Sequence, residues 1–181
     1  MYIPQKIFFT KGSGIHKEKL TSFEMALRNA GIAAFNIVAV SSIYPAGCKI
    51  VEREEGLKEL TPGQIVHAVY TKQETNEPSR RIVASIGMAW PKDPAFHGYL
   101  SEHHAFGESA NDSGNYAEDL AAEMLATILG VEFDPDSSWD EKRQIWKISD
   151  KIVESRNITA AATGDENGKW TTVVTAAVLL P

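Results

Sequence analysis

Apolar, β-prone runs separated by turn-forming residues dominate this 181-residue sequence, and they constrain its fold more than any other feature. Runs rich in Val, Ile, Thr and aromatic residues are typical of strands. The Gly-Asp-Glu-Asn-Gly segment that joins the last two runs favours a hairpin turn. The polar, Glu-rich residues 51–63 are expected to form a surface loop. Strands are therefore predicted at 35–40, 64–71, 80–90, 97–104, 145–163 and 169–180.

Two segments have the periodicity of substantial helices. The first begins at residues 21–24 (TSFE), which have the S/T-x-x-E form of a capping box with Glu24 as the acidic member. The second spans 113–129, with Asp112 or Ser113 as its cap. This helix is expected to cover one sheet face with an apolar side that includes Leu120, Met124 and Ile128.

Many strands and few helices favour an α+β layered sandwich, with mainly antiparallel strands, over a doubly wound parallel sheet. The length suits a single domain that spans residues 1–181. A net charge of -6 provides no positive field for a polyanion, so nucleic-acid binding is not expected. No apolar run approaches the ~20 residues that span a bilayer, and the N-terminus has no signal-peptide pattern, so we expect a cytoplasmic protein without membrane contacts.

Polar residues interrupt or end the apolar runs at three positions. Asn36 lies inside the first run, Ser41 and Ser42 directly follow it, and Glu102 lies inside the fourth. Each has a purely structural explanation: a backbone hydrogen bond, the end of a strand, or a solvated strand face. A serine hydrolase is not indicated, because no G-x-S-x-G motif surrounds either serine.

Histidine and cysteine offer little for metal chemistry. The cluster of His97, Glu102, His103 and His104 matches no zinc motif, and adjacent residues on a strand point to opposite faces, so no metal site is expected. Cys48 is the single cysteine, which excludes a disulfide within the chain. A small, unreactive thiol is the favoured interpretation of Cys48 over a nucleophile.

Two adjacent serines at a tight turn can react with their own backbone. If Oγ of Ser42 attacks the carbonyl carbon of Ser41, the amide becomes an ester. A β-elimination then breaks the chain and leaves dehydroalanine, which hydrolyses to a pyruvoyl group. A turn that holds the hydroxyl close to the preceding carbonyl favours this rearrangement. Ser42 would then be the precursor of a covalent cofactor.

Three segments give the sequence a recognisable likeness. It resembles the pyruvoyl-dependent arginine decarboxylases in NAGIxxxNIVxVSSIYP (29–45), AWPKD (89–93) and HGYLSE (97–102), which occur in the same order. The resemblance implies cleavage between Ser41 and Ser42. It thus implies a β chain of residues 1–41 and an α chain of residues 42–181 that begins with a pyruvoyl group derived from Ser42.

The same resemblance implies roles for individual residues. Asn36 matches an active-site asparagine close to the pyruvoyl group and the substrate, where Ser41 also lies, and Glu102 matches a proposed proton donor. Glu24 aligns with the acidic residue that binds the substrate guanidinium, which in the family is an aspartate. A glutamate can still form a bidentate pair with a guanidinium. Glu24 is also the acidic member of the predicted capping box, and both interpretations stay open.

The family's reaction converts L-arginine to agmatine and CO2. The pyruvoyl carbonyl groups accept electron density as CO2 leaves, so neither pyridoxal phosphate nor a metal is expected. The resemblance also implies a four-layer αββα subunit and a trimer of processed αβ pairs, with active sites between subunits. Two alternatives remain: a pyruvoyl-dependent decarboxylase for another amino acid, and a non-catalytic oligomeric α+β protein whose serines only end a strand.

Overall fold

A computed structural model describes residues 2–130 and 152–181 of the chain. The described residues form an α+β fold, as predicted, with two β-sheets and three helices. The helices are α1 (Lys19–Ala30), α2 (Arg53–Lys58) and α3 (Ala110–Leu129). The strands are β1 (Lys6–His16), β2 (Asn36–Ala39), β3 (Ile43–Tyr44), β4 (Lys49–Ile50), β5 (Ile65–Thr75), β6 (Arg81–Pro91), β7 (Gly98–Phe106), β8 (Ile152–Thr163) and β9 (Trp170–Leu180).

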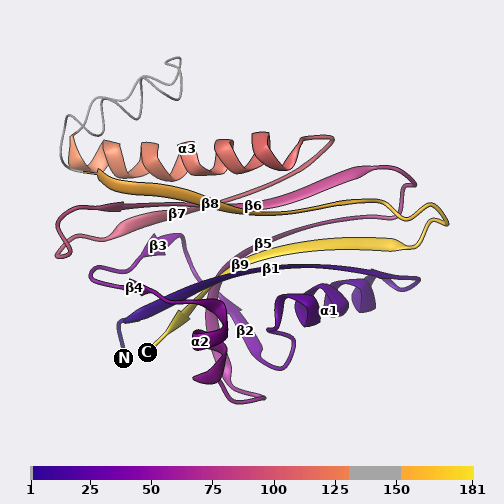
Figure 1. Cartoon of the computed structure of the whole chain (residues 1–181), viewed down its shortest axis with the longest axis horizontal. Coiled ribbons are helices and arrows are strands. Elements are labelled where there is room, and N and C mark those ends of the chain that lie inside the picture. The colour runs from indigo at the N-terminus through magenta and orange to yellow at the C-terminus, as the bar shows by residue number, and fades with distance from the viewer. Residues whose placement is uncertain (1, 131–151) are drawn as a thin grey trace.

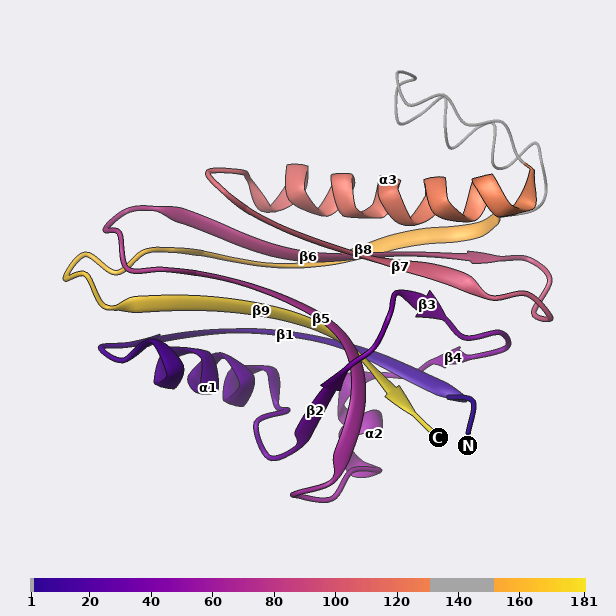
Figure 2. The same cartoon turned by 180° about the vertical axis from the view of Figure 1, so that it is seen from behind.

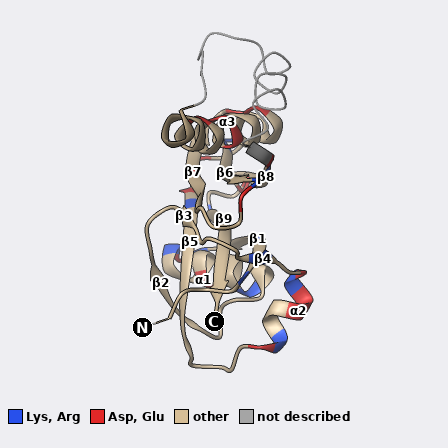
Figure 3. Ribbon diagram, turned by 90° about the vertical axis from the view of Figure 1, so that its left-hand side faces the viewer, with Lys and Arg blue, Asp and Glu red and all other residues tan. Residues whose placement is uncertain are grey.

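The two sheets differ in strand direction. The five-stranded sheet, in the order β2-β5-β9-β1-β4, is mixed, because β2 runs parallel to β5 and β4 parallel to β1. The four-stranded sheet, in the order β3-β7-β6-β8, is antiparallel. The sheets lie face to face (Figures 1 and 2), with α3 on the outer side of the four-stranded sheet and α1 on the outer side of the five-stranded sheet. Figure 3 shows the same order along the molecule from α3 to α1.

Strand β1 shows how the core is divided. Successive side chains of a strand point to opposite faces, so neighbouring apolar residues serve two different clusters. Ile7 packs between the two sheets with Val69 and Leu100. Phe8 packs on the other face with Ala26 and other residues of α1. Both faces of the five-stranded sheet are therefore covered at this strand, which explains its nearly continuous apolar start.

The predicted capping box is wrong. Helix α1 begins at Lys19, and its N-cap is Glu18, whose side chain makes no capping hydrogen bond. Ser22 lies inside the first turn and is buried, where its hydroxyl bonds Lys19 O and Thr172 Oγ1 of β9. The contact with the sheet, rather than the local motif, thus fixes this end of the helix.

Helix α3 begins earlier than predicted and packs with a different side. Its N-cap is Ser109, whose hydroxyl accepts a hydrogen bond from Asp112 N. Gly87 of β6 lies so close to the helix that an added Cβ would stand 2.0 Å from Ala117 O. Only small side chains fit such an approach, so the buried face consists mainly of Gly114, Ala117, Ala121, Ala122 and Ala126. The expected residues Leu120 and Met124 are only partly buried, and Ile128 is exposed.

Other differences also have tertiary causes. Strand β1 is not among the predicted strands, because Gly12 and Gly14 interrupt its apolar pattern where α1 packs directly against its backbone.

The predicted loop at 51–63 contains the short helix α2. The Asn-Gly turn is present, with Gly168 at φ +71°, but no hairpin forms, since β8 and β9 belong to different sheets. Residues 145–151 of the predicted strand lie outside the described residues. None of the three described helices is long and apolar enough to span a membrane.

Candidate active site

Ser41 and Ser42 lie where the chain crosses from one sheet to the other. Before them, Val40 N donates a hydrogen bond to Ala68 O and so extends the pairing of β2 with β5. After them, Leu100 N donates to Ser42 O, next to the pairing of β3 with β7. The dipeptide therefore leaves the edge of the five-stranded sheet and enters the edge of the four-stranded sheet. The backbone of this junction is therefore held by hydrogen bonds to β5 on one side and to β7 on the other.

The junction forms a three-residue turn centred on Ser42. Ile43 N donates a hydrogen bond to Ser41 O at 2.8 Å, which is the i to i+2 bond of a γ-turn. Among the described residues, Ser79 is the only non-glycine residue with positive φ, so Ser42 has the inverse, unstrained form of this turn. The carbonyl of Ser41 is thus polarised by an N–H group from its own turn.

Glu102 of β7 reaches the same junction. The hydroxyl Oγ of Ser42 donates a hydrogen bond to Glu102 Oε2 at 2.7 Å. Glu102 lies on the same strand face as Leu100, which is fully buried between the sheets. Ser42 is half-buried, and Ser41 and Glu102 are exposed in the single chain. A carboxylate and a hydroxyl are therefore in contact beside the Ser41–Ser42 peptide bond, and this bond lies at an accessible edge.

Two of the predicted site residues, Asn36 and Glu24, lie away from Ser42 in the folded chain. Asn36 begins β2, at the end of the strand opposite Ser41, and its Nδ2 donates to Gly63 O at 2.8 Å. The nearly continuous apolar sequence of β2 is typical of a strand covered on both faces, but Asn36 and two of the three residues after it are exposed. Glu24 lies on α1, on the other side of the five-stranded sheet, and accepts a hydrogen bond from Arg28 Nε at 2.5 Å. One chain alone does not bring either residue to Ser42.

An apolar cavity of about 510 Å³ adjoins the junction on the side of Ser41 and Ile43. Its lining includes Tyr2 and His67, which are joined by a hydrogen bond of 2.8 Å between Tyr2 Oη and His67 Nδ1. Neither residue is among the predicted site residues. Tyr2 precedes β1 and His67 lies in β5, so only the folded chain brings them to Ser41.

The histidines of β7 point in opposite directions, as strand geometry predicts. His103 Nε2 bonds Glu108 Oε2 at 2.9 Å, while His104 Nδ1 bonds Thr71 Oγ1 of the other sheet at 3.2 Å. Within residues 2–130 and 152–181, no group of three or more His, Cys, Asp or Glu side chains is arranged to hold a metal. Cys48 is buried, and this burial raises the pKa of its thiol to about 11. Such a thiol is a poor nucleophile at neutral pH.

Comparison with known proteins gives a consistent result. The family model for pyruvoyl-dependent arginine decarboxylase matches residues 6–181. A probable pyruvoyl-dependent arginine decarboxylase of Chloroherpeton thalassium is 58% identical over 180 residues, which cover 99% of each chain. A protein of the same description from Chlorobium luteolum is 61% identical over the same share of both chains. The pyruvoyl-dependent arginine decarboxylase of Nitrosopumilus maritimus is 55% identical over 98% of this chain and 97% of its own.

Proposed function

The chain belongs to the pyruvoyl-dependent arginine decarboxylase family, and we propose that it converts L-arginine to agmatine and CO2 with a pyruvoyl group made from its own Ser42. The observation that supports Ser42 as the precursor of the pyruvoyl group is the hydrogen bond of 2.7 Å between Ser42 Oγ and Glu102 Oε2. Among the two serines, it is Ser42 whose hydroxyl has a carboxylate as its partner. The carbonyl that this hydroxyl must attack belongs to the preceding residue and already accepts the N–H of Ile43.

Self-cleavage begins with a proton transfer that the chain's own groups can perform. Glu102 accepts the proton of Ser42 Oγ, and the oxygen attacks the carbonyl carbon of Ser41. Negative charge then develops on Ser41 O, where the N–H of Ile43 stabilises it as an oxyanion-hole donor does. The C–N bond breaks, Ser42 N takes up the proton held by Glu102, and an ester joins Ser41 to the side chain of Ser42.

The second stage separates the two chains. Loss of the Cα proton of Ser42 expels Ser41 as a free carboxylate and leaves dehydroalanine at position 42. One water molecule then replaces the nitrogen of dehydroalanine, which leaves as ammonia, and the ketone of the pyruvoyl group forms. The products are a β chain of residues 1–41 and an α chain of residues 42–181. These residues fit the group, because the nucleophile and the carbonyl belong to one turn and the base contacts that turn from β7.

After cleavage the same carboxyl group serves the decarboxylation. The pyruvoyl group supplies the electron sink for CO2 loss, a role in which pyridoxal phosphate or a metal is not needed. Glu102 stays beside position 42, and we assign it the delivery of a proton to the α-carbon of the substrate. Ser41 and Asn36 are assigned to the surroundings of the substrate, with Ser41 next to the apolar cavity.

Glu24 is assigned to the substrate guanidinium, in the active site of a neighbouring copy. In the single chain Glu24 does not cap the helix but pairs with Arg28. This pair of a carboxylate with a guanidinium has the same chemistry as the proposed pairing of Glu24 with the substrate. An exposed pair at i and i+4 contributes only about 0.3–0.5 kcal/mol, so a substrate can displace it. The position of α1, across the five-stranded sheet from Ser42, supports an assembly of αββα subunits, for which we propose a trimer of αβ pairs.

Intact-mass spectrometry of the purified protein tests the cleavage. The expected result is a fragment that ends at Ser41 and a fragment of residues 42–181 whose N-terminus carries a ketone instead of an amine. A substrate panel of arginine, lysine, ornithine and aspartate then tests specificity, and agmatine is expected as the main product. An uncut chain without agmatine formation would overturn the proposal, and faster turnover of another amino acid would correct the substrate.

A further inference from the structure

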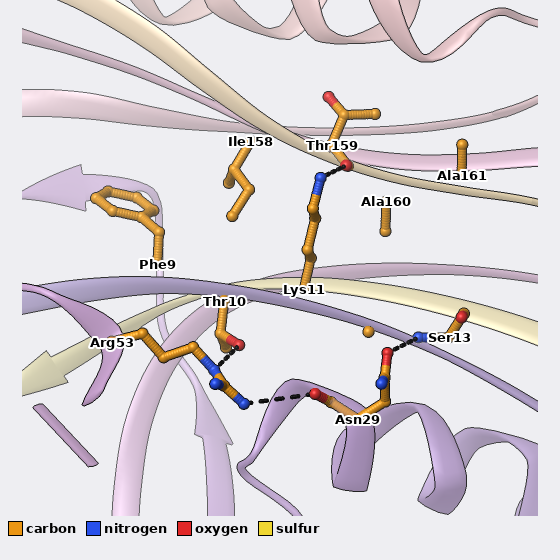
Figure 4. A pocket seen from close by; sticks show the side chains of 11 residues that line it. Phe9, Thr10, Lys11, Ser13, Asn29, Arg53, Ile158, Thr159, Ala160 and Ala161 are labelled. Carbon is orange, nitrogen blue, oxygen red and sulfur yellow. Dashed lines mark hydrogen bonds between the residues drawn. The ribbon is translucent and has the colours of Figure 1, made fainter. Parts of the chain in front are cut away.

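A second cavity lies on the opposite side of the molecule from Ser42. It has a volume of about 450 Å³, within the range typical of small-molecule sites, and opens between strand β1 of one sheet and strand β8 of the other (Figure 4). Strands β2 and β3, which flank Ser42, are the far ends of the same two sheets. The cavity is therefore separate from the proposed active site.

Two cationic side chains give this cavity its chemistry. Lys11 extends from β1 across the opening, and its Nζ donates to Thr159 O at 2.9 Å. Arg53 lies below it, where Nε donates to Thr10 Oγ1 and Ala30 O, and the terminal nitrogens bond Glu54 Oε1 and Asn29 O. None of the described residues that line the cavity is acidic. Glu54, outside this lining, pairs with Arg53, so the lining itself carries two positive charges and no negative one in a chain with a net charge of -6.

The two side chains retain donors that the protein does not use. Lysine has three N–H donors and arginine five. The hydrogen bonds among the described residues use one donor of Lys11 and one on each nitrogen of Arg53. Two N–H groups of each side chain are left for a ligand. A small anion with several oxygen atoms can accept from both side chains at once.

The backbone of β1 adds further donors. Strand β4 pairs with β1 only at Lys6 and Ile7. Val51 N donates to Ile7 O, and Ser13 N donates to Asn29 Oδ1, so both Ile7 and Ser13 direct backbone groups away from β9. Because backbone groups alternate along a strand, every second residue of β1 between them does the same. By this alternation the N–H groups of Phe9 and Lys11 face the cavity. Backbone N–H groups beside cationic side chains are a recurrent arrangement for binding anions.

A purely structural explanation makes a different prediction. Lysine at a strand edge prevents pairing with other chains, and Arg53 caps the carboxyl end of α1 through Asn29 O and Ala30 O. These roles involve no ligand, so they predict no saturable binding of anions. The substrate and the product are poor candidates for the ligand of this cavity. Arginine and agmatine each carry a guanidinium, whose positive charge Lys11 and Arg53 would repel.

We propose that this cavity binds a small oxyanion, of the carboxylate or phosphate class, through Lys11, Arg53 and the edge of β1. Isothermal titration at constant ionic strength, with citrate in one arm and inorganic phosphate in the other, tests the site and distinguishes the two sources. Saturable binding of at least one anion is expected. Lys11→Gln should weaken it at least about tenfold, Lys11→Arg should largely preserve it, and Lys17→Gln, a control just after β1, should not change it.

Three results would overturn this proposal. The first is the absence of saturable binding of both anions to the wild-type protein. The second is equal affinity of wild type and Lys11→Gln, which would show that the anion binds elsewhere. The third is competition by agmatine, which would locate the binding in the active site. Because the readout is binding, it is independent of whether the Ser41–Ser42 bond is cut.

Discussion

The two open edges of the sandwich carry opposite chemistry. At the edge formed by β2, β3 and β7, a carboxylate accepts a hydrogen bond from Ser42 beside an apolar cavity. At the edge formed by β1 and β8, Lys11 and Arg53 line a cavity whose described lining contains no acidic residue. A cationic substrate is attracted by the first edge and repelled by the second. The fold thus separates the proposed site for arginine from the proposed site for anions.

The two edges also differ in how the backbone is used. At the β1 and β8 edge the strands simply run past each other, and side chains close part of the opening. At the other edge the chain itself passes between the sheets through Ser41 and Ser42. Such a crossing produces a turn that is held by β5 at Val40, before it, and by β7 at Ser42, its central residue. The reactive bond is therefore expected at this edge and not at the other.

Replacement of the nucleophile should have the largest effect. Ser42→Ala removes the hydroxyl proposed to attack Ser41, so the chain should stay uncut and form no agmatine. Ser42→Thr keeps the hydroxyl but adds a methyl group that restricts its rotation, so slow cleavage is expected. Intact mass and agmatine formation measure both variants. Cleavage of Ser42→Ala at the same bond would contradict the mechanism.

Removal of the base should have the next largest effect. Glu102→Gln keeps the shape of the side chain but cannot accept the proton, so cleavage should slow by about 10²–10⁴-fold. Glu108→Gln is a matched control, because Glu108 pairs with His103 on the other face of β7. The time course of cleavage, followed by gel or mass, gives both rates. Equal rates for the two variants would remove Glu102 from the cleavage step.

The N–H group of Ile43 can be removed without changing its side chain. Incorporation of the α-hydroxy acid analogue of isoleucine at position 43 replaces the N–H by oxygen and leaves Ser41 O without its donor. Cleavage should slow by about a hundredfold, as for loss of an oxyanion donor. The same replacement at Ile37 is the control, since alternation along β2 directs its N–H away from β5. Similar rates for the two analogues would show that the turn only positions the chain.

At the basic edge, Arg53 should matter for stability. Arg53→Met removes the donors to Ala30 O and Asn29 O at the end of α1, which should lower the free energy of unfolding by about 1–2 kcal/mol. Urea denaturation measures this difference. Arg80→Met is the control, because Arg80 is half exposed, pairs loosely with Glu77 and lies over the Phe106 ring, without capping a helix. An unchanged stability would leave Arg53 as a ligand-binding residue without a structural role.

The smallest effect is expected away from both edges, at Glu74 of β5. Partial burial raises the pKa of this carboxyl, but hydrogen bonds from Lys19 and Lys72 outweigh it and hold the pKa below its ordinary value. A lowered pKa stabilises the fold above the ordinary carboxyl range, and this contribution is lost as pH falls through the lowered value. Glu74→Gln should therefore be less stable by about 0.5 kcal/mol at neutral pH. Denaturation at pH 7 and below pH ~4 should show that the difference disappears on acidification.

Local sequence predicted some elements well and others poorly. The strands β5, β6, β7 and β9 were predicted because their apolar runs are long and bounded by turn residues. The start of α1 and the buried face of α3 were predicted wrongly, because a contact with a neighbouring sheet outweighed the local pattern in each case. Strand β1 was missed because its glycines serve a helix that packs on it.

The sequence by itself determined the family and drew attention to Ser41, Ser42 and Glu102, because segments of the chain resemble a known family in the same order. Only the tertiary structure decided that Ser42 and Glu102 touch, although 60 residues separate them along the chain. It also decided that β2 and β3 enter different sheets and that Lys11 faces Thr159 from the other sheet. The physical reason is that periodicity reports which side of an element is apolar. Which sheet edge that element occupies depends on packing between segments distant in sequence.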